Sequence, residues 1–149
     1  MRFLPNLRRS AALAACAAVL AACSDSSIET SSIYGAYILV EYNNADIPAP
    51  QACDAAARVE GGSVVLNSNG TATHTLVLES ATGVESELHS TGTFTVADDE
   101  VLLVLNQGSG PTFTLTAQLT EGGMRITRQS SCSTTVTEEY TGPYVILNP

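Results

Sequence analysis

Two histidines and three nearby glutamates are the residues whose types and spacing come closest to a metal site. His74 and His89 lie in segments that could form neighbouring strands of a hairpin, together with Glu79, Glu85 and Glu87. A zinc site needs about three ligands that meet in space. Both histidines, however, lie among Thr and Glu residues, which predicts solvent-facing strand positions. We therefore expect no metal site and no cofactor.

Sequence motifs for nucleophilic catalysis or phosphate binding do not occur in the chain. There is no G-x-S-x-G nucleophile elbow, and Gly108-Ser109-Gly110 precedes a proline and a predicted strand, which favours a loop. The run Asp98-Asp99-Glu100 lacks the spaced oxygen ligands of a calcium loop and is typical of a hairpin turn. The sequence therefore predicts a protein that is not an enzyme. An enzyme with an unrecognised site is the alternative.

The N-terminal residues have the pattern of an export signal. Arg2, Arg8 and Arg9 precede an uncharged run from Ser10 to Ala22 that is mostly Ala, Leu and Val. This run is shorter than the roughly 20 apolar residues that a membrane-spanning helix needs. A cleaved signal peptide is therefore favoured over a transmembrane helix.

The end of this apolar run contains a more specific motif. Leu20-Ala21-Ala22-Cys23 resembles the lipobox of bacterial lipoproteins, in which an aliphatic and two small residues precede a cysteine. The resemblance implies that lipid is bonded to the sulfur of Cys23 and that the chain is cut before it. Leu13-Ala14-Ala15-Cys16 has the same pattern, but a cut there would leave too short an apolar region. We expect a signal peptide over residues 1–22, a Ser-rich tether over 23–32 and one domain over 33–149.

The lipobox resemblance also predicts where the protein resides. Lipid on Cys23 would anchor it in the bacterial cell envelope, and Ser24 favours the periplasmic face of the outer membrane. The predicted mature chain holds all fifteen acidic residues against Arg58, Arg125 and Arg128, a formal net charge of about −12. Such a surface repels nucleic acid and anionic headgroups. The expected partner is therefore the membrane, reached through the lipid, and not nucleic acid; no protein partner is indicated.

Two cysteines remain once Cys16 is removed with the signal peptide and Cys23 is lipidated. A pair of cysteines in an exported chain predicts a disulfide, here Cys53–Cys132. Two free thiols are the alternative.

From residue 33 onward, alternation of apolar and polar residues predicts β-strands. Short connections rich in Gly, Asn and Asp favour hairpins between sequence neighbours. Ala52–Ala57 is expected to form a helical turn, and the continuously apolar Val101–Leu105 is expected to be covered on both faces. The predicted strands are Tyr34–Tyr42, Arg58–Leu66, Thr71–Ser80, Thr91–Ala97, Val101–Leu105, Thr112–Thr120, Gly123–Arg128 and Thr134–Tyr140, with Tyr144–Leu147 as one more strand or a clasp. We expect an all-β antiparallel meander of about eight strands, closed as a barrel, with a β-sandwich as the alternative.

The motifs along these strands resemble those of small bacterial lipocalin-like lipoprotein domains. The family pattern is matched by Gly35–Leu39, by Ile47-Pro48 followed by Cys53, and by the Gly-Gly to Asn-Gly-Thr stretch of residues 61–71. Tyr37 stands where the family has Trp. The resemblance implies that Arg125 or Arg128 packs across this ring.

An eight-stranded barrel can hold one small ligand. The expected function is thus that of a lipid-anchored envelope protein with a non-catalytic barrel that takes a small apolar molecule. A protein-interaction or structural module of the envelope is the alternative.

Overall fold

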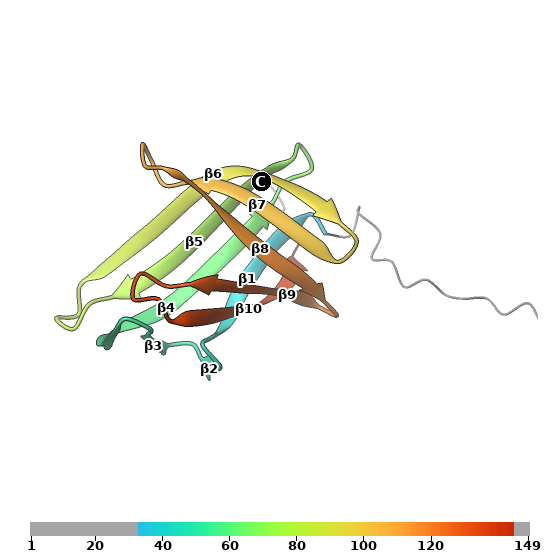
Figure 1. Cartoon of the computed structure of the whole chain (residues 1–149). Helices are drawn as coiled ribbons and strands as arrows, with labels where there is room; N and C mark the ends of the chain where they lie inside the picture. The colour runs from blue at the N-terminus through green and yellow to red at the C-terminus, as the bar shows by residue number, and fades with distance from the viewer. Residues whose placement is uncertain (1–32, 145–149) are drawn as a thin grey trace, which may run out of the picture.

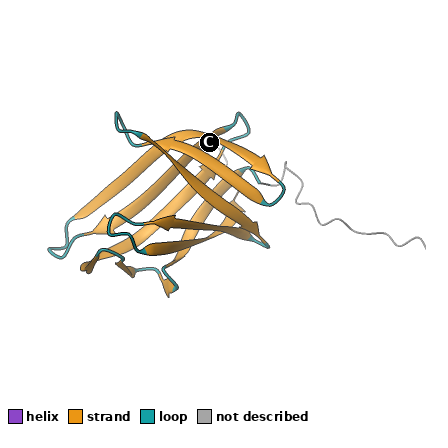
Figure 2. Ribbon diagram, in the orientation of Figure 1, coloured by secondary structure: helices purple, strands orange, loops and turns teal. Residues whose placement is uncertain are grey.

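The computed structural model describes residues 33–144, which form one antiparallel sheet (Figures 1 and 2). Its strands are β1 (Gly35–Tyr42), β2 (Ala45–Asp46), β3 (Ala49–Gln51), β4 (Asp54–Leu66), β5 (Thr71–Glu79), β6 (Glu85–Ala97), β7 (Glu100–Asn106), β8 (Thr112–Thr120), β9 (Gly123–Gln129) and β10 (Thr135–Tyr144). The described part contains no helix long and apolar enough to cross a membrane.

The sheet closes on itself. From β4 to β10 each strand pairs with the next in sequence, β10 pairs with β1, and β1 also pairs with β4. Strands β1 and β4 to β10 therefore make a closed meander barrel, with the short β2 and β3 attached to it. The predicted eight-stranded barrel is confirmed, and the sandwich alternative is wrong because the ring of pairings has no break between two sheets.

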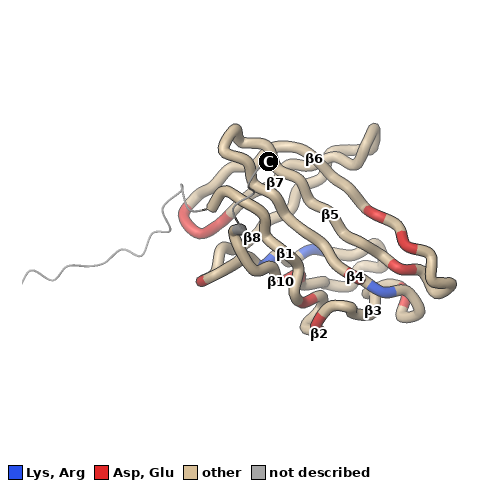
Figure 3. Tube along the Cα trace, turned by 180° about the vertical axis from the view of Figure 1, so that it is seen from behind, with Lys and Arg blue, Asp and Glu red and all other residues tan. Residues whose placement is uncertain are grey.

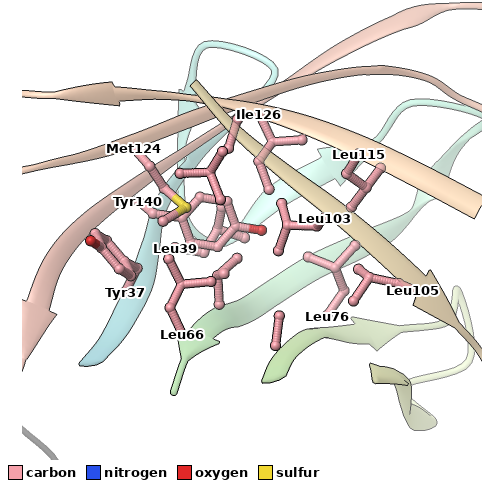
Figure 4. Packing of buried hydrophobic residues seen from close by; sticks show 14 of the residues in the cluster. Tyr37, Leu39, Leu66, Leu76, Leu103, Leu105, Leu115, Met124, Ile126 and Tyr140 are labelled. Atoms are coloured by element: carbon pink, nitrogen blue, oxygen red, sulfur yellow. The ribbon is translucent and has the colours of Figure 1, made fainter. Parts of the chain in front are cut away.

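Successive side chains of each strand point alternately into the barrel and out of it, and the inward-pointing ones form the core. Strand β7 buries Val101, Leu103 and Leu105 and turns Leu102 and Val104 outward, where they are 37% and 39% exposed. The expectation that both faces of Val101–Leu105 are covered is thus wrong, because only the inner face of a barrel wall is packed. Figure 4 shows buried side chains from several strands, among them Leu103, converging in the interior.

Three other local predictions need correction. Ala52–Ala57 is a turn followed by strand β4, since the segment pairs with β3 instead of winding into a helix. Strand β6 begins at Glu85 rather than Thr91, because it pairs with β5 along its whole first half. The strand predicted as Thr134–Tyr140 runs from Thr135 to Tyr144, because its last residues still pair with β1. Of the separately predicted Tyr144–Leu147, the residues after Tyr144 lie outside the described part.

The ring of strands is closed, but β8 and β9 are hydrogen-bonded over only part of their length, which leaves a gap in the barrel wall. These strands pair only from Ala117↔Ile126 to Thr120↔Gly123. The preceding part of β8, from Thr112, pairs with β7 alone, and the last residues of β9, to Gln129, pair with β10 alone. In Figure 1, β8 runs diagonally away from β9 and β10.

The first half of strand β6 has no partner on its β7 side, which widens the same gap in the wall. It pairs with β7 only from Thr91 onward, so its first half, paired with β5 alone, projects past the β7–β8 turn. Gly92 lies at this change of partner, where a Cβ atom would collide with the backbone of Val104. Glycine is typical of such close approaches at barrel corners. The barrel is therefore packed at one end and accessible at the other.

Candidate ligand cavity

A cavity of about 460 Å³ lies inside the open part of the barrel. This volume falls within the range of small-molecule sites. Strands β5, β6, β8 and β9 and the turn after β7 supply its walls. Its lining residues are His74, Leu76, Leu88, Ser90, Gln107, Phe113, Thr114, Leu115, Thr116, Thr127, Arg128 and Gln129.

The lining divides by chemistry. Leu76, Leu88, Phe113 and Leu115 supply apolar surface, and Leu88 is 40% exposed because it faces the accessible end of the barrel. Threonine and glutamine side chains surround the mouth between β8 and β9. His74, Ser90 and Arg128 supply polar groups to the same space. Such a combination suits a molecule with an apolar body and one polar group.

A buried polar cluster, made of His74, Arg128, Glu138 and Tyr140, adjoins the cavity. Glu138 Oε1 accepts a hydrogen bond from Arg128 Nε at 2.8 Å and forms an ion pair with Arg128 Nη2 at 2.7 Å. Glu138 Oε2 accepts from the Tyr140 hydroxyl at 2.7 Å and lies 3.1 Å from His74 Nε2. His74 Nε2 is also 3.1 Å from the Tyr140 hydroxyl oxygen. The carboxylate thus has two partners on each oxygen.

This geometry determines the tautomer of His74. The Tyr140 hydroxyl gives its proton to Glu138, so both neighbours of Nε2 are acceptors. The hydrogen is therefore placed on Nε2, as inferred from the partners. In the neutral ring, Nδ1 then carries a lone pair.

Glu138 is an ionised carboxylate in this setting, although its side chain has no solvent exposure. Burial alone would raise its pKa. The hydrogen bond from His74 and the charge of Arg128 outweigh burial and lower the pKa of Glu138 to about 2. Burial and the neighbouring Glu138 carboxylate raise the pKa of Tyr140 well above its ordinary value, so its hydroxyl keeps the proton that it donates.

Three polar atoms of the lining residues are not engaged by other side chains or backbone groups of the described chain. His74 Nδ1, Ser90 Oγ and Arg128 Nη1 have no hydrogen-bond partner among residues 33–144. In the same part of the chain, every side-chain nitrogen or oxygen sealed from solvent has a partner. These three atoms are therefore accessible, and the residues that carry them line the cavity.

A second space of about 220 Å³ adjoins the first towards the end of the barrel that carries the disulfide. Leu76, Leu88 and Arg128 line both, and Cys53 lines the second. Cys53 is bonded to Cys132, with the two Cα atoms 5.7 Å apart, which confirms the predicted disulfide. It joins the β3–β4 turn to the β9–β10 turn. Cys23 lies outside the described residues.

The predicted position of His74 is wrong. It is 6% exposed and faces the interior, whereas His89, in the next strand, has a side chain that is 55% exposed. Alternation explains the difference, because His74 shares its face with the buried Ala72 and Leu76, while His89 lies opposite Thr75 on the outer face. The two histidines therefore cannot bind one metal ion.

The other residues singled out from the sequence lie on the outside. Glu85 and Glu87 are exposed on β6, and Glu79 is half-buried. Ser109 lies in the exposed β7–β8 turn, and Asp98 and Asp99 make the turn after β6. Residues 33–144 contain no group of three His, Cys, Asp or Glu placed to hold a metal ion. Figure 3 shows acidic residues towards the hairpins, with long uncharged stretches of strand between them.

Both arginines considered as partners of Tyr37 contact carboxylates of β10 instead. Arg128 bonds to Glu138, and Arg125 pairs with Glu139. The Tyr37 ring is buried, and its hydroxyl donates to the Ile33 carbonyl at 2.8 Å. Burial raises the pKa of Tyr37 to about 12.

No protein-family model, curated protein or solved structure matches this chain.

Proposed function

We propose that this chain is a lipid-anchored protein of the bacterial cell envelope whose barrel binds a small amphipathic molecule. The observation that carries the proposal is the cavity of about 460 Å³ between β8 and β9, lined by leucines at the open end of the barrel. Arg128 and His74 are held in place by Glu138 before any ligand arrives. Such preorganisation lowers the cost of binding.

Filling the cavity should weaken ligand binding. Ser90→Phe places a ring where a buried serine now lines the space. A neutral apolar probe, N-phenyl-1-naphthylamine, should bind the wild-type protein with saturable fluorescence enhancement. Ser90→Phe should weaken that binding at least tenfold, about 1.4 kcal/mol.

Thr91→Phe is the matched control, because Thr91 is adjacent on β6 but exposed on the outer face. It should bind the probe as the wild type does. Equal affinity of the wild type and Ser90→Phe, with both folded, would place the probe elsewhere and contradict the proposal.

The lipid anchor is a separate part of the proposal and rests on Leu20-Ala21-Ala22-Cys23. Mass spectrometry of the protein from its native envelope should find a mature chain that begins at Cys23 and carries a diacylglyceryl group. It should fractionate with the outer membrane. A mature N-terminus elsewhere, or an unmodified Cys23, would refute this part and leave the cavity unaffected.

A hydrolase is the second candidate, because Ser90 and His74 are register partners and Glu138 bonds the far nitrogen of His74. A nucleophilic serine needs a hydrogen bond to its base. No such bond joins Ser90 Oγ and His74 Nδ1 among the described contacts. We therefore favour binding without catalysis.

A screen of p-nitrophenyl esters of different chain lengths tests this preference. The protein should give no turnover above the rate of buffer hydrolysis. Turnover that disappears in a folded Ser90→Ala variant would establish the hydrolase instead.

A further inference from the structure

The charge of the cavity differs from that of the protein around it. The predicted mature chain is strongly acidic, yet no Asp or Glu is among the described residues that line either space. Arg128 is the charged residue that lines both. Glu138, which neutralises it, lies behind it with no exposure and with both oxygens already bonded. A ligand therefore meets Arg128 Nη1 and not the carboxylate.

His74 requires that an acidic ligand bound beside Arg128 share a hydrogen with its Nδ1 atom. Its Nε2 hydrogen is committed to Glu138 and Tyr140, so the ring nitrogen left for a ligand is Nδ1, which carries a lone pair while His74 is neutral. A carboxylate oxygen has no hydrogen to give to that lone pair, and the two would repel each other. A hydrogen between them removes the repulsion and creates a charge-assisted hydrogen bond.

We propose that the cavity binds an amphipathic monocarboxylate together with one proton. The carboxylate head lies between Arg128 Nη1 and His74 Nδ1, and its apolar chain lies along Leu76, Leu88 and Leu115. The proton comes from solvent and lies between Nδ1 and a carboxylate oxygen; no other bond forms or breaks. This inference rests on the proposed binding function and adds the class of ligand and its linkage to pH.

The charged groups that face His74 are one carboxylate and one guanidinium. Glu138 and Tyr140 come from β10 and Arg128 from β9, while Ser90 of β6 and Val64 of β4, its register partners, are uncharged. Arg128 is offset by Glu138, so the cluster has no net charge while His74 is neutral. The proton and the carboxylate cancel, and the filled cavity stays uncharged, which limits the cost of burying the ligand head.

Calorimetry with two matched probes tests the inference on the purified protein. Decanoate and 1-decanol share a chain but differ in the head. Each is titrated in two mildly alkaline buffers whose ionisation enthalpies differ, since the change in observed heat then counts protons taken up. Decanoate should bind with uptake of about one proton per molecule by linkage. Decanol should bind without uptake.

The His74→Gln variant keeps an N–H donor for Glu138 but has no titratable nitrogen. It should lose the proton uptake and at least tenfold in decanoate affinity, with decanol unchanged. His89→Gln, on the outer face, is the control and should behave as the wild type. Where His74→Gln fails to fold, the wild-type comparison of buffers still decides.

The other possible results each contradict the inference, and they differ in whether the proposed binding function survives. Decanoate bound without a proton, or with a proton that persists in folded His74→Gln, overturns the inference. Binding of decanol alone overturns it and leaves the proposed function standing. Binding of neither probe overturns both.

Discussion

The Arg128→Leu variant should lose about 3–5 kcal/mol of unfolding free energy, the range for breaking one partner of a buried ion pair. Glu138 has no exposure, and Arg128 both donates a hydrogen bond to it from Nε and forms an ion pair with it through Nη2. Removing the guanidinium leaves a carboxylate inside the barrel with only His74 and Tyr140 as donors. Urea denaturation at neutral pH measures the loss.

Arg125→Leu is the matched control on the same strand. Its partner is Glu139, next to Glu138, but the Arg125 side chain is 56% exposed. Exposed pairs contribute at most about 1 kcal/mol, so this variant should change stability little. Arg128→Leu combined with Glu138→Gln should recover part of the loss, because no charge is then buried. Equal losses for the two arginine variants would contradict the role of the buried pair.

Lowering the pH should also destabilise the wild-type protein, because it protonates Glu138 and so removes the buried ion pair with Arg128. The pKa of Glu138 is lowered from its ordinary 4.5 to about 2, so its stabilisation is complete above pH 4.5 and is lost as the pH falls towards 2. At about 1.4 kcal/mol per pH unit, the loss reaches about 3 kcal/mol. Stability that does not change over this interval would show that Glu138 is not ionised in the fold.

Removing the disulfide should have an effect of similar size. The Cys53→Ser/Cys132→Ser variant frees a loop whose ends are 79 residues apart in sequence. The chain-entropy model gives about 4–5 kcal/mol for a loop of this length, before any strain in the folded state. The same bond holds the β3–β4 turn against the β9–β10 turn, beside the second space.

Reduction of the wild-type protein is the companion measurement. Dithiothreitol should lower its midpoint of urea unfolding to that of the double serine variant, and should leave the variant itself unchanged. A midpoint of the double variant equal to that of the oxidised wild type would contradict the stabilising role.

Alternation along the strands was enough to predict the barrel, because a wall with one packed face imposes a period of two. The turns followed from Asn, Asp and Gly. Where alternation was weak the prediction failed: Val101–Leu105 is apolar on both faces, although only one is packed. The first residues of β6, from Glu85, do not alternate clearly, because Glu, Ser and His are polar and most of this segment is exposed.

The polar cluster could have been found in part from the same period. In β5, His74 lies two residues from both Ala72 and Leu76 and therefore on the same buried face. In β10, Glu138 lies two residues from the buried Val136. A charged or polar residue on the buried face of a strand indicates a hydrogen-bonding or ionic partner on another strand of the interior. The Thr and Glu neighbours of His74 in sequence favour an exposed position and so mask this signal.

The cavity itself could not be predicted. Strands β8 and β9 would continue to pair if their register extended past Ala117↔Ile126, and nothing in their residues marks where pairing ends. The partnership of Arg128 with Glu138 depends on which strands become neighbours after closure.

An NMR titration of the labelled protein with 1-decanol tests the central claim most directly, since it locates a bound amphiphile residue by residue. Saturable shift changes should centre on the amides of Ser90, Leu115 and Arg128, which line the cavity, and should spare the outward-facing Leu102 and Val104 of β7. Changes confined to the outer face of β7, or none at saturation, would contradict the account.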